Sequence, residues 1–273
     1  MIAFNGRAVP VAPTDAEAAA AAFISIERAL RIDDQNEANY ADLGHREQLV
    51  VRTLSRNPDW IPGVLAALPA DLQPILELHM LARSELGQLH TAPPLETLPA
   101  WQIIDPEPLD ELRSHYEEAS ASTGIDWEIL AAINLIETGM GRIDGLSSAG
   151  AQGPMQFLPT TWDEVSQGGD IDDPHDAIQG AARYLVQRGG LDDIRNGLFG
   201  YNNSDHYVNA VLAYADLLRL DERSLHGFYN WEIYVGSDVG TLWLPVGFTT
   251  DGTLSAADYL RDNPWAETIV QAS

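Results

Sequence analysis

The chain has 273 residues, 45% of them hydrophobic, which suffices for one large domain or two smaller ones with a sizeable core. Its 41 acidic residues stand against 15 arginines and no lysine, and the formal net charge of −26 disfavours binding to nucleic acid or anionic lipid. The absence of cysteine excludes disulfides, thiolate catalysis and cysteine-ligated zinc. We therefore expect any substrate to be recognised by shape and hydrogen bonds rather than by overall charge.

The first third of the chain is predicted to be helical. Apolar residues recur at helical spacing in four stretches, residues 14–30, 40–54, 59–68 and 70–87. Thr14 and Glu17 have the spacing of a capping box at the start of the first. Residues 91–109 hold five prolines and are the best linker candidate. We predict that residues 1–105 form a helical scaffold packed on the rest of the chain, with a docking element as the alternative.

A second helical block is predicted for residues 106–222, and a different structure for residues 223–273. The expected helices of the block cover residues 108–123, 125–138, 159–165, 172–190 and 203–220, with Asp126 and Ser204 as N-cap candidates. After them, two β-rich runs flank a Gly-Ser-Asp-Val-Gly turn at residues 236–240, which predicts a hairpin. The remainder, from residue 249, is expected to be surface coil or short helix. The fold class predicted is mainly α with a small C-terminal β-hairpin.

No metal or cofactor site is predicted. The seven histidines form no ligand cluster, and no nucleotide-binding glycine loop occurs. An acidic stretch lacks the spacing and the closing glutamate of a calcium loop, so helix capping and loop solvation explain it better; its members are Asp170, Asp172, Asp173 and Asp176. No apolar run approaches the roughly 20 residues that cross a bilayer, and the first residues lack the pattern of an export signal.

One glutamate stands at the end of an apolar helical stretch. Glu137 lies one turn after Ile133 and two turns after Leu130, which places it on the apolar face. Burial disfavours the ionised carboxylate, and the negative end of the helix dipole acts in the same direction. We expect a raised pKa, which suits a general acid. The alternative is a glutamate at the rim whose stem covers apolar surface.

The loop after this helix has features of a sugar-binding groove. Small residues allow close approach of a polymer to the backbone, namely Ala149, Gly150, Ala151 and Gly153. Gln156 offers an amide donor and acceptor. Met155 and Phe157 offer apolar surface for a sugar face and its acetamido methyl group. Farther on, Tyr201 and Asn202 stand just before a predicted helix, in a position to face the same groove.

Four motifs in these segments resemble the catalytic domain of bacterial lytic transglycosylases, which has a lysozyme-like fold. E-[ST]-x-x-G is found at residues 137–141, and a relaxed S-x-x-G-A-x-G-x-M-Q-F-x-P at residues 147–159. A-A-x-Y-L follows at residues 181–185 and Y-N at residues 201–202. The resemblance covers roughly residues 110–220 and is closest to secreted single-domain forms. Met140 stands where some relatives carry an aromatic residue, so its part in sugar stacking is in doubt.

The resemblance implies cleavage of the β-1,4 bond between N-acetylmuramic acid and N-acetylglucosamine in peptidoglycan glycan strands. Glu137 would protonate the leaving oxygen, and the muramoyl acetamido group would stabilise the oxocarbenium-like centre. Glu137 would then accept the proton of the C6 hydroxyl as a 1,6-anhydro ring closes, so that one carboxylate suffices where most glycosidases need two. The resemblance also assigns Gln156 and Tyr201 to the acetamido group or to Glu137 itself. It assigns the sugar groove to Thr138, Ser148, Ala149, Met155, Phe157 and Asn202.

Two other functions stay open from the sequence. A hydrolytic muramidase on the same fold would use water in place of the C6 hydroxyl, with Asp144, Asp163 or Glu164 as the base. A non-catalytic wall-binding module would need no acid at all. In each case the expected partner is peptidoglycan rather than nucleic acid, with no membrane span. The expected location is extracytoplasmic, with the export signal absent from this sequence.

Overall fold

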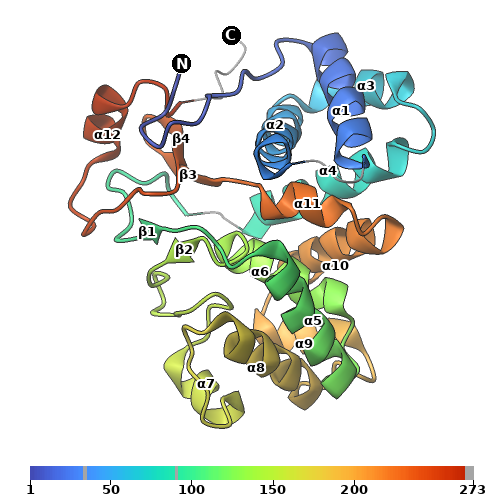
Figure 1. Ribbon diagram of the computed structural model, residues 1–273, viewed down its shortest axis with the longest axis vertical. Helices are drawn as coiled ribbons and strands as arrows, with labels where there is room; N and C mark the ends of the chain where they lie inside the picture. Colours follow the sequence, from blue (N-terminus) through green and yellow to red (C-terminus); the bar gives the residue numbers. More distant parts are fainter. Residues whose placement is uncertain (33–35, 90–91, 268–273) are drawn as a thin grey trace.

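The N-terminal part of the protein is a layer of helices (Figure 1). The structure, a computed structural model, describes residues 1–32, 36–89 and 92–267. The layer contains α1 (Ala16–Leu30), α2 (Glu37–Arg56), the 3₁₀ turn η1 (Pro58–Trp60), α3 (Ile61–Ala67) and α4 (Gln73–Leu89). α1 begins after Asp15, whose carboxylate accepts a hydrogen bond of 2.8 Å from the Ala18 backbone N–H. The predicted capping box at Thr14 is therefore wrong by one residue.

The lower half of the molecule in Figure 1 is a second set of helices around α6. They are α5 (Leu109–Thr123), α6 (Trp127–Thr138), α7 (Pro159–Val165), α8 (Pro174–Gln187), α9 (Ile194–Tyr201) and α10 (Asp205–Leu220). α11 (Ser224–Tyr229) follows α10 and packs mainly against α2 of the N-terminal layer. α6 is buried on nearly all sides because α5, α8 and α10 pack around it. The predicted mainly α, lysozyme-like fold is confirmed. The short helices α9 and α11 were not predicted.

Two small antiparallel sheets complete the fold. β1 (Gln102–Ile103) pairs with β2 (Ile143–Asp144), and β3 (Ile233–Ser237) pairs with β4 (Gly240–Leu244). The second pair is the predicted hairpin, with Tyr234 opposite Trp243. The segment after it forms α12 (Ala256–Asp262), which confirms the short helix. This segment is not a mere surface coil, because Tyr259 and Trp265 pack with Trp243 in a small second core.

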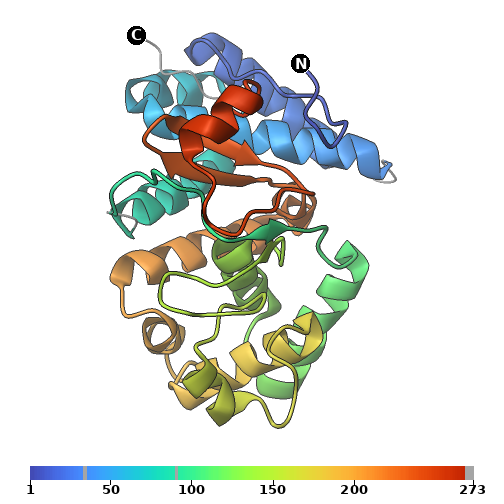
Figure 2. The ribbon, with the colours of Figure 1, turned by 90° about the vertical axis from the view of Figure 1, so that its left-hand side faces the viewer.

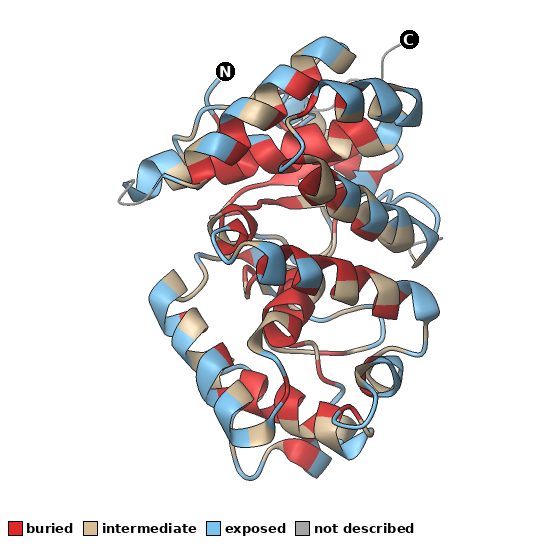
Figure 3. Cartoon of the chain, turned by 90° about the vertical axis from the view of Figure 1, so that its right-hand side faces the viewer, coloured by how far each residue is buried: buried red, intermediate tan, exposed pale blue. Residues whose placement is uncertain are grey.

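The N-terminal helices and the lower helices share one hydrophobic core. α4 packs along α10, and Phe23, Leu76, Tyr214 and Phe228 are all buried in that core. Figure 3 shows buried residues facing inward in both halves, with the strands of the hairpin buried between them. No helix in the described part of the chain is both long and apolar enough to cross a bilayer.

The segment predicted as a linker is fixed along the hairpin. The backbone N–H of Leu95 donates to Gly236 O at 3.1 Å, and Asp238 N–H donates to Leu95 O at 3.1 Å. Figure 2 shows this segment running beside the hairpin and α12, between the upper and lower helices. Through it, the hairpin and the β1–β2 pair stand at fixed positions beside the end of α6.

Candidate active site

The end of α6 places Glu137 beside the hairpin. The helix stops at Gly139, which has a positive φ of 62° and accepts the left-handed conformation that ends helices. A Cβ atom at Gly139 would lie 2.6 Å from Ile233 Cδ1, so any other residue here would displace that side chain of β3. Asp126 occupies the N-cap position as predicted, but its carboxylate pairs with Arg219 and caps no N–H group. The apolar helix thus ends in one carboxyl group next to β3.

The carboxyl group of Glu137 has one neutral hydrogen-bond donor. Tyr207 Oη donates to Glu137 Oε1 at 2.7 Å. Burial raises the pKa of Glu137 to about 7, and the bond from Tyr207 opposes that shift. The pKa of Tyr207 is itself raised well above its usual value, first by burial and then by Glu137, so the phenol keeps its proton. The predicted raised pKa is confirmed, and Glu137 is poised to give a proton near neutral pH.

The predicted neutral partners of Glu137 bind elsewhere. Tyr201 Oη donates to Met155 O at 2.7 Å, and Gln156 Nε2 donates to Gly153 O at 3.0 Å. The alternative in which these two side chains hold Glu137 is therefore wrong in this structure, and their contact with the acetamido group stays a prediction. The actual donor, Tyr207, belongs to the buried face of α10, where helical periodicity alone gives no reason to separate it from its apolar neighbours.

A buried polar network ties α6 to the loop after it. Asn134 Nδ2 donates to Pro154 O at 2.8 Å, and Thr138 Oγ1 donates to the same oxygen at 2.6 Å. Asn134 Oδ1 accepts from Tyr116 Oη at 2.6 Å. Thr138 is fully buried, so its predicted contact with sugar is wrong. Its hydroxyl instead holds the loop at a fixed distance from the turn that carries Glu137.

Met155 and Phe157 are also buried rather than exposed to a groove. They are 0% and 3% exposed, because both side chains point into the core. The ring of Phe157 packs against Tyr201, with the centroids 5.5 Å apart. Tyr201 in turn lies parallel to Tyr207 at 6.3 Å. The predicted apolar sugar surface is therefore wrong at these two positions, which instead support the aromatic side chains beside Glu137. Met140, 1% exposed, offers no stacking surface either.

The glycine-rich loop is shaped by its own contacts. Ser147 Oγ accepts from the backbone N–H groups of Ala149 and Ala151 at 3.2 and 3.0 Å. A Cβ atom at Gly153 would lie 2.0 Å from Ile171 O, so this glycine allows close approach of the protein's own backbone and not of a polymer. The structure leaves other predicted groove residues accessible: Ser148 and Ala149 are exposed and Asn202 is partly exposed. Their contact with sugar stays a prediction.

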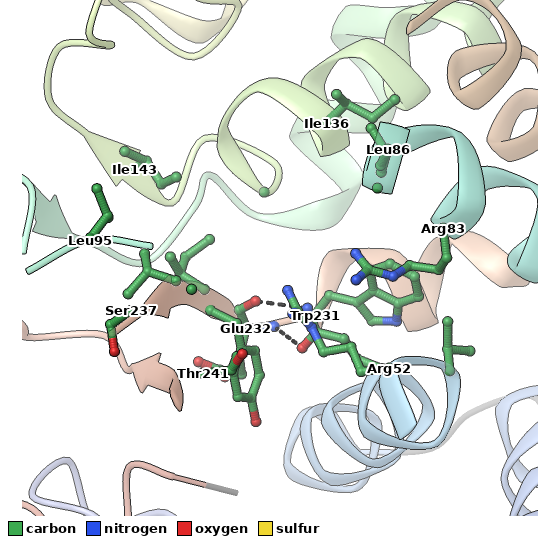
Figure 4. Close-up of a pocket in the computed structure, with 18 of the residues that line it drawn as sticks. Arg52, Arg83, Leu86, Leu95, Ile136, Ile143, Trp231, Glu232, Ser237 and Thr241 are labelled. Carbon is green, nitrogen blue, oxygen red and sulfur yellow. Dashed lines mark hydrogen bonds between the residues drawn. The ribbon is translucent and has the colours of Figure 1, made fainter. Parts of the chain in front are cut away.

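A cavity of about 980 Å³ opens beside Glu137. Its walls come from α2, α4, residues 92–101, the end of α6 and the hairpin (Figure 4). Glu137 lines it, but the other eight predicted site residues do not. The cavity instead gathers side chains suited to a sugar and to an anion that sequence reasoning missed, namely Trp101, Trp231, Tyr234, Arg52, Arg56 and Arg83. They come from four separate segments that share no motif, and so only the fold brings them together.

Within the described ranges, two groups of side chains have the spacing of metal ligands, and neither lines the cavity. One is buried among the N-terminal helices and consists of Glu27, Glu47 and His79. The other, exposed at the start of α8, consists of Asp173, His175 and Asp176. Asp173 Oδ1 accepts from Asp176 N–H at 3.0 Å, which confirms the capping predicted for this acidic stretch. Neither group is placed to take part in chemistry at Glu137.

Comparison with known proteins identifies the central part of the chain. Residues 114–218 match the family model for the transglycosylase SLT domain, which confirms the resemblance found in the motifs. The chain is also 36% identical over 81 residues to a membrane-bound lytic murein transglycosylase F of Thiobacillus denitrificans. That match covers 30% of this chain and 17% of the relative, so the chain spans less than a fifth of the relative's length. No solved structure matches the chain.

Proposed function

We propose that this protein is a peptidoglycan lytic transglycosylase that cleaves the β-1,4 bond between N-acetylmuramic acid and N-acetylglucosamine. The observation that carries the proposal is Glu137, a carboxyl group with a pKa of about 7 at the edge of a large cavity, inside a segment that matches the SLT domain. Such a group gives a proton and takes one back at the same pH, as a non-hydrolytic cleavage requires.

Glu137 protonates the glycosidic oxygen as the bond to the muramoyl C1 breaks. The electrons of that bond leave with the N-acetylglucosamine oxygen, and the muramoyl acetamido oxygen shares the positive charge at C1. Glu137, now a carboxylate stabilised by Tyr207, removes the proton of the C6 hydroxyl. The C6 oxygen bonds to C1 and closes the 1,6-anhydro ring. No water is consumed, and Glu137 ends protonated, ready for the next bond.

The surroundings of Glu137 favour this mechanism over hydrolysis. Asp144, Asp163 and Glu164, the three candidate bases of a muramidase, are exposed, and none of them lines the cavity. Two other carboxyl groups do line it, Glu232 and Glu267. Glu232 is buried and paired with Arg7 and with Trp243 Nε1. Glu267 is exposed, its backbone forms a bridge with Leu242 at the edge of the hairpin, and its charge acts on Arg56. Among the described residues of the cavity wall, no second carboxylate contributes to the pKa of Glu137, which burial and Tyr207 determine.

The test is mass spectrometry of the muropeptides that the protein releases from purified sacculi. The wild-type protein is expected to release anhydromuramoyl products, each one water lighter than a hydrolysed end. Glu137→Gln should release none, and Asp144→Asn, the matched control, should behave as wild type. Hydrated ends would indicate a muramidase instead. Release by Glu137→Gln at the wild-type rate would show that cleavage does not depend on this residue, and no release by the wild-type protein would leave only a wall-binding role.

The substrate also sets the location that we propose. Peptidoglycan lies outside the cytoplasmic membrane, and the matching relative from Thiobacillus denitrificans is described as membrane-bound. We place this protein in the cell envelope or outside the cell. Fractionation of cells that express the full gene, followed by immunoblotting, tests this: recovery with the cytoplasm alone would contradict it.

A further inference from the structure

The cavity beside Glu137 contains arginines that have no acidic partner in the described part of the chain. Arg52 of α2 and Arg83 of α4 both line it, and Figure 4 shows their side chains reaching toward the same region beside Trp231. Neither guanidinium group forms a hydrogen bond or ion pair with any residue that the structure describes. The Nε atoms of both are buried without a partner there. Arg52 packs over the ring of Tyr234, 4.6 Å from its centroid, which orients the group but leaves its N–H donors free.

Many arginines outside the cavity pair with carboxylates, as Arg28 does with Asp71 and Arg219 with Asp126. Others donate to backbone oxygens, as Arg142 does to Tyr229 O and Arg183 to Val165 O. Arg52 and Arg83 have neither kind of partner among the described residues, and both line one cavity. They therefore mark a local region of positive charge inside a strongly negative molecule.

Burial and mutual repulsion make the charged form of the cavity arginines less stable. Burial and then repulsion from Arg83 lower the pKa of Arg52 to about 9. A third guanidinium, that of Arg56, lies at the rim, donates to Thr241 Oγ1 and is also repelled by Arg83. Glu267 offsets part of the charge of Arg56. Partly desolvated guanidinium groups that lack a carboxylate are stabilised when an oxyanion binds between them in a bidentate manner.

We propose that Arg52 and Arg83, with Arg56 at the rim, form a binding site for a carboxylate of the peptide branch on the glycan strand cleaved at Glu137. This inference rests on the proposed function. The sugars of an intact strand are neutral, and its carboxylates lie on the peptides attached to the lactyl groups. One continuous cavity of about 980 Å³ holds both Glu137 and the arginines, which is large enough for a sugar together with part of its peptide.

The position of the arginines separates binding from catalysis. The pKa of Glu137 is set by burial and by Tyr207 and not by a guanidinium group, so the anion site does not tune the acid. The arginines come from the N-terminal helices, outside the matched SLT segment, residues 114–218. The N-terminal layer thus acquires a role: it selects strands that still carry peptides and orients them over Glu137.

Calorimetric titration tests the proposal without turnover. The protein is Glu137→Gln, and the ligands are a disaccharide-pentapeptide and the same molecule with its peptide carboxylates converted to amides. We expect the acidic ligand to bind at least tenfold more tightly, which corresponds to about 1.4 kcal/mol. Adding Arg52→Gln and Arg83→Gln should remove this difference, and the double lysine variant should restore part of it. Arg28→Gln, which removes an exposed ion pair, is the matched control.

The outcomes distinguish this inference from the proposed function. Equal affinity for the two ligands in the parent protein would overturn the carboxylate site, while cleavage of strands freed of peptide would still support the enzyme. Inorganic phosphate that competes equally with both ligands would indicate a general oxyanion site and would also overturn the proposal. If the double variant does not fold, Arg83→Gln alone, at a partly exposed position, is used, and an unchanged preference then counts against the proposal.

Discussion

The two sides of the cavity differ in the ionisable groups that they contain and in the partners of those groups. On the α6 side, Glu137 has a neutral donor, Tyr207, and no cation shifts its pKa. On the side of the N-terminal helices, Arg52 and Arg83 are cations that have no acidic partner among the residues that the structure describes. The first arrangement keeps a proton on the carboxyl group near neutral pH, and the second is suited to hold an anion in place. Chemistry and recognition are thus built from different parts of the chain.

The largest effect is expected on the α6 side. Glu137→Gln keeps the shape of the side chain and removes its proton transfer, so kcat for release of anhydro products should fall at least about 1000-fold. The affinity for the acidic disaccharide-pentapeptide should change little, because the arginines are untouched. Steady-state release and calorimetry on the same variant measure both. A large loss of affinity would show that the two sides of the cavity are not separate.

How far the sequence predicts this site depends on whether the signal is local. Glu137 is predictable because its helix is largely apolar and a motif begins at it. Tyr207 was missed because it shares the buried periodicity of α10 with Val208 and Val211. The prediction that Met155 and Phe157 line a groove fails because a motif tells which residues recur but not which way a side chain points. Both positions are in the core.

Recognition by charge was missed for a different reason. A net charge of −26 predicts that overall charge plays no part in binding, and for the whole surface this stays a prediction. Arg52 and Arg83 lie in separate helices of ordinary amphipathic pattern, α2 and α4. Their meeting depends on how these helices pack, which composition and periodicity do not reveal. The mainly α fold and the hairpin were predictable because they arise from local periodicity and turn residues.

The next largest effect is expected on the network that holds the loop to α6. Asn134→Ala leaves Pro154 O with one donor fewer, and it leaves Tyr116 Oη with the Met140 sulfur, at 3.5 Å, as its remaining acceptor. The site is buried, with 0% exposure at Asn134. The free energy of unfolding should fall by roughly 3 kcal/mol. Urea denaturation measures it, with the exposed Asn196→Ala as the control. A change below about 0.5 kcal/mol would mean that the network does not hold the loop.

A buried acid in the N-terminal layer predicts how stability depends on pH. Burial, with the neighbouring Glu47 carboxyl, raises the pKa of Glu27 to about 8 in the folded protein. Because the folded pKa lies above the unfolded one, this group's stabilisation is complete below the unfolded pKa and is lost as pH rises toward 8. The free energy of unfolding should therefore fall by roughly 2 kcal/mol from pH 6 to pH 8. Glu27→Gln should flatten this decline.

The control for this pH dependence is Glu77→Gln, an exposed residue of α4. It should keep the wild-type slope in urea denaturation between pH 6 and pH 8. An equal slope in Glu27→Gln and wild type would show that Glu27 is already ionised in the folded protein, held so by its ion pair with Arg31. Glu137, whose pKa is raised to about 7 in the folded protein, adds to this decline, so Glu137→Gln should lessen the slope and leave the part that is due to Glu27.

The smallest effect is expected from Tyr207→Phe. This variant keeps the carboxyl group of Glu137 and changes only its pKa. The bond from Tyr207 stabilises the ionised carboxylate and so lowers the pKa of Glu137 against the larger effect of burial. Without it the pKa rises, and the alkaline limb of kcat/KM, where the acid loses its proton, should move to higher pH. The maximal rate should fall about tenfold, because the carboxylate formed in the first step loses a charge-assisted hydrogen bond worth about 1.4 kcal/mol. Tyr201→Phe, whose hydroxyl binds Met155 O, should leave that limb in place. A limb that moves to lower pH in Tyr207→Phe would mean that a cation, and not burial together with the Tyr207 hydrogen bond, determines the pKa of Glu137.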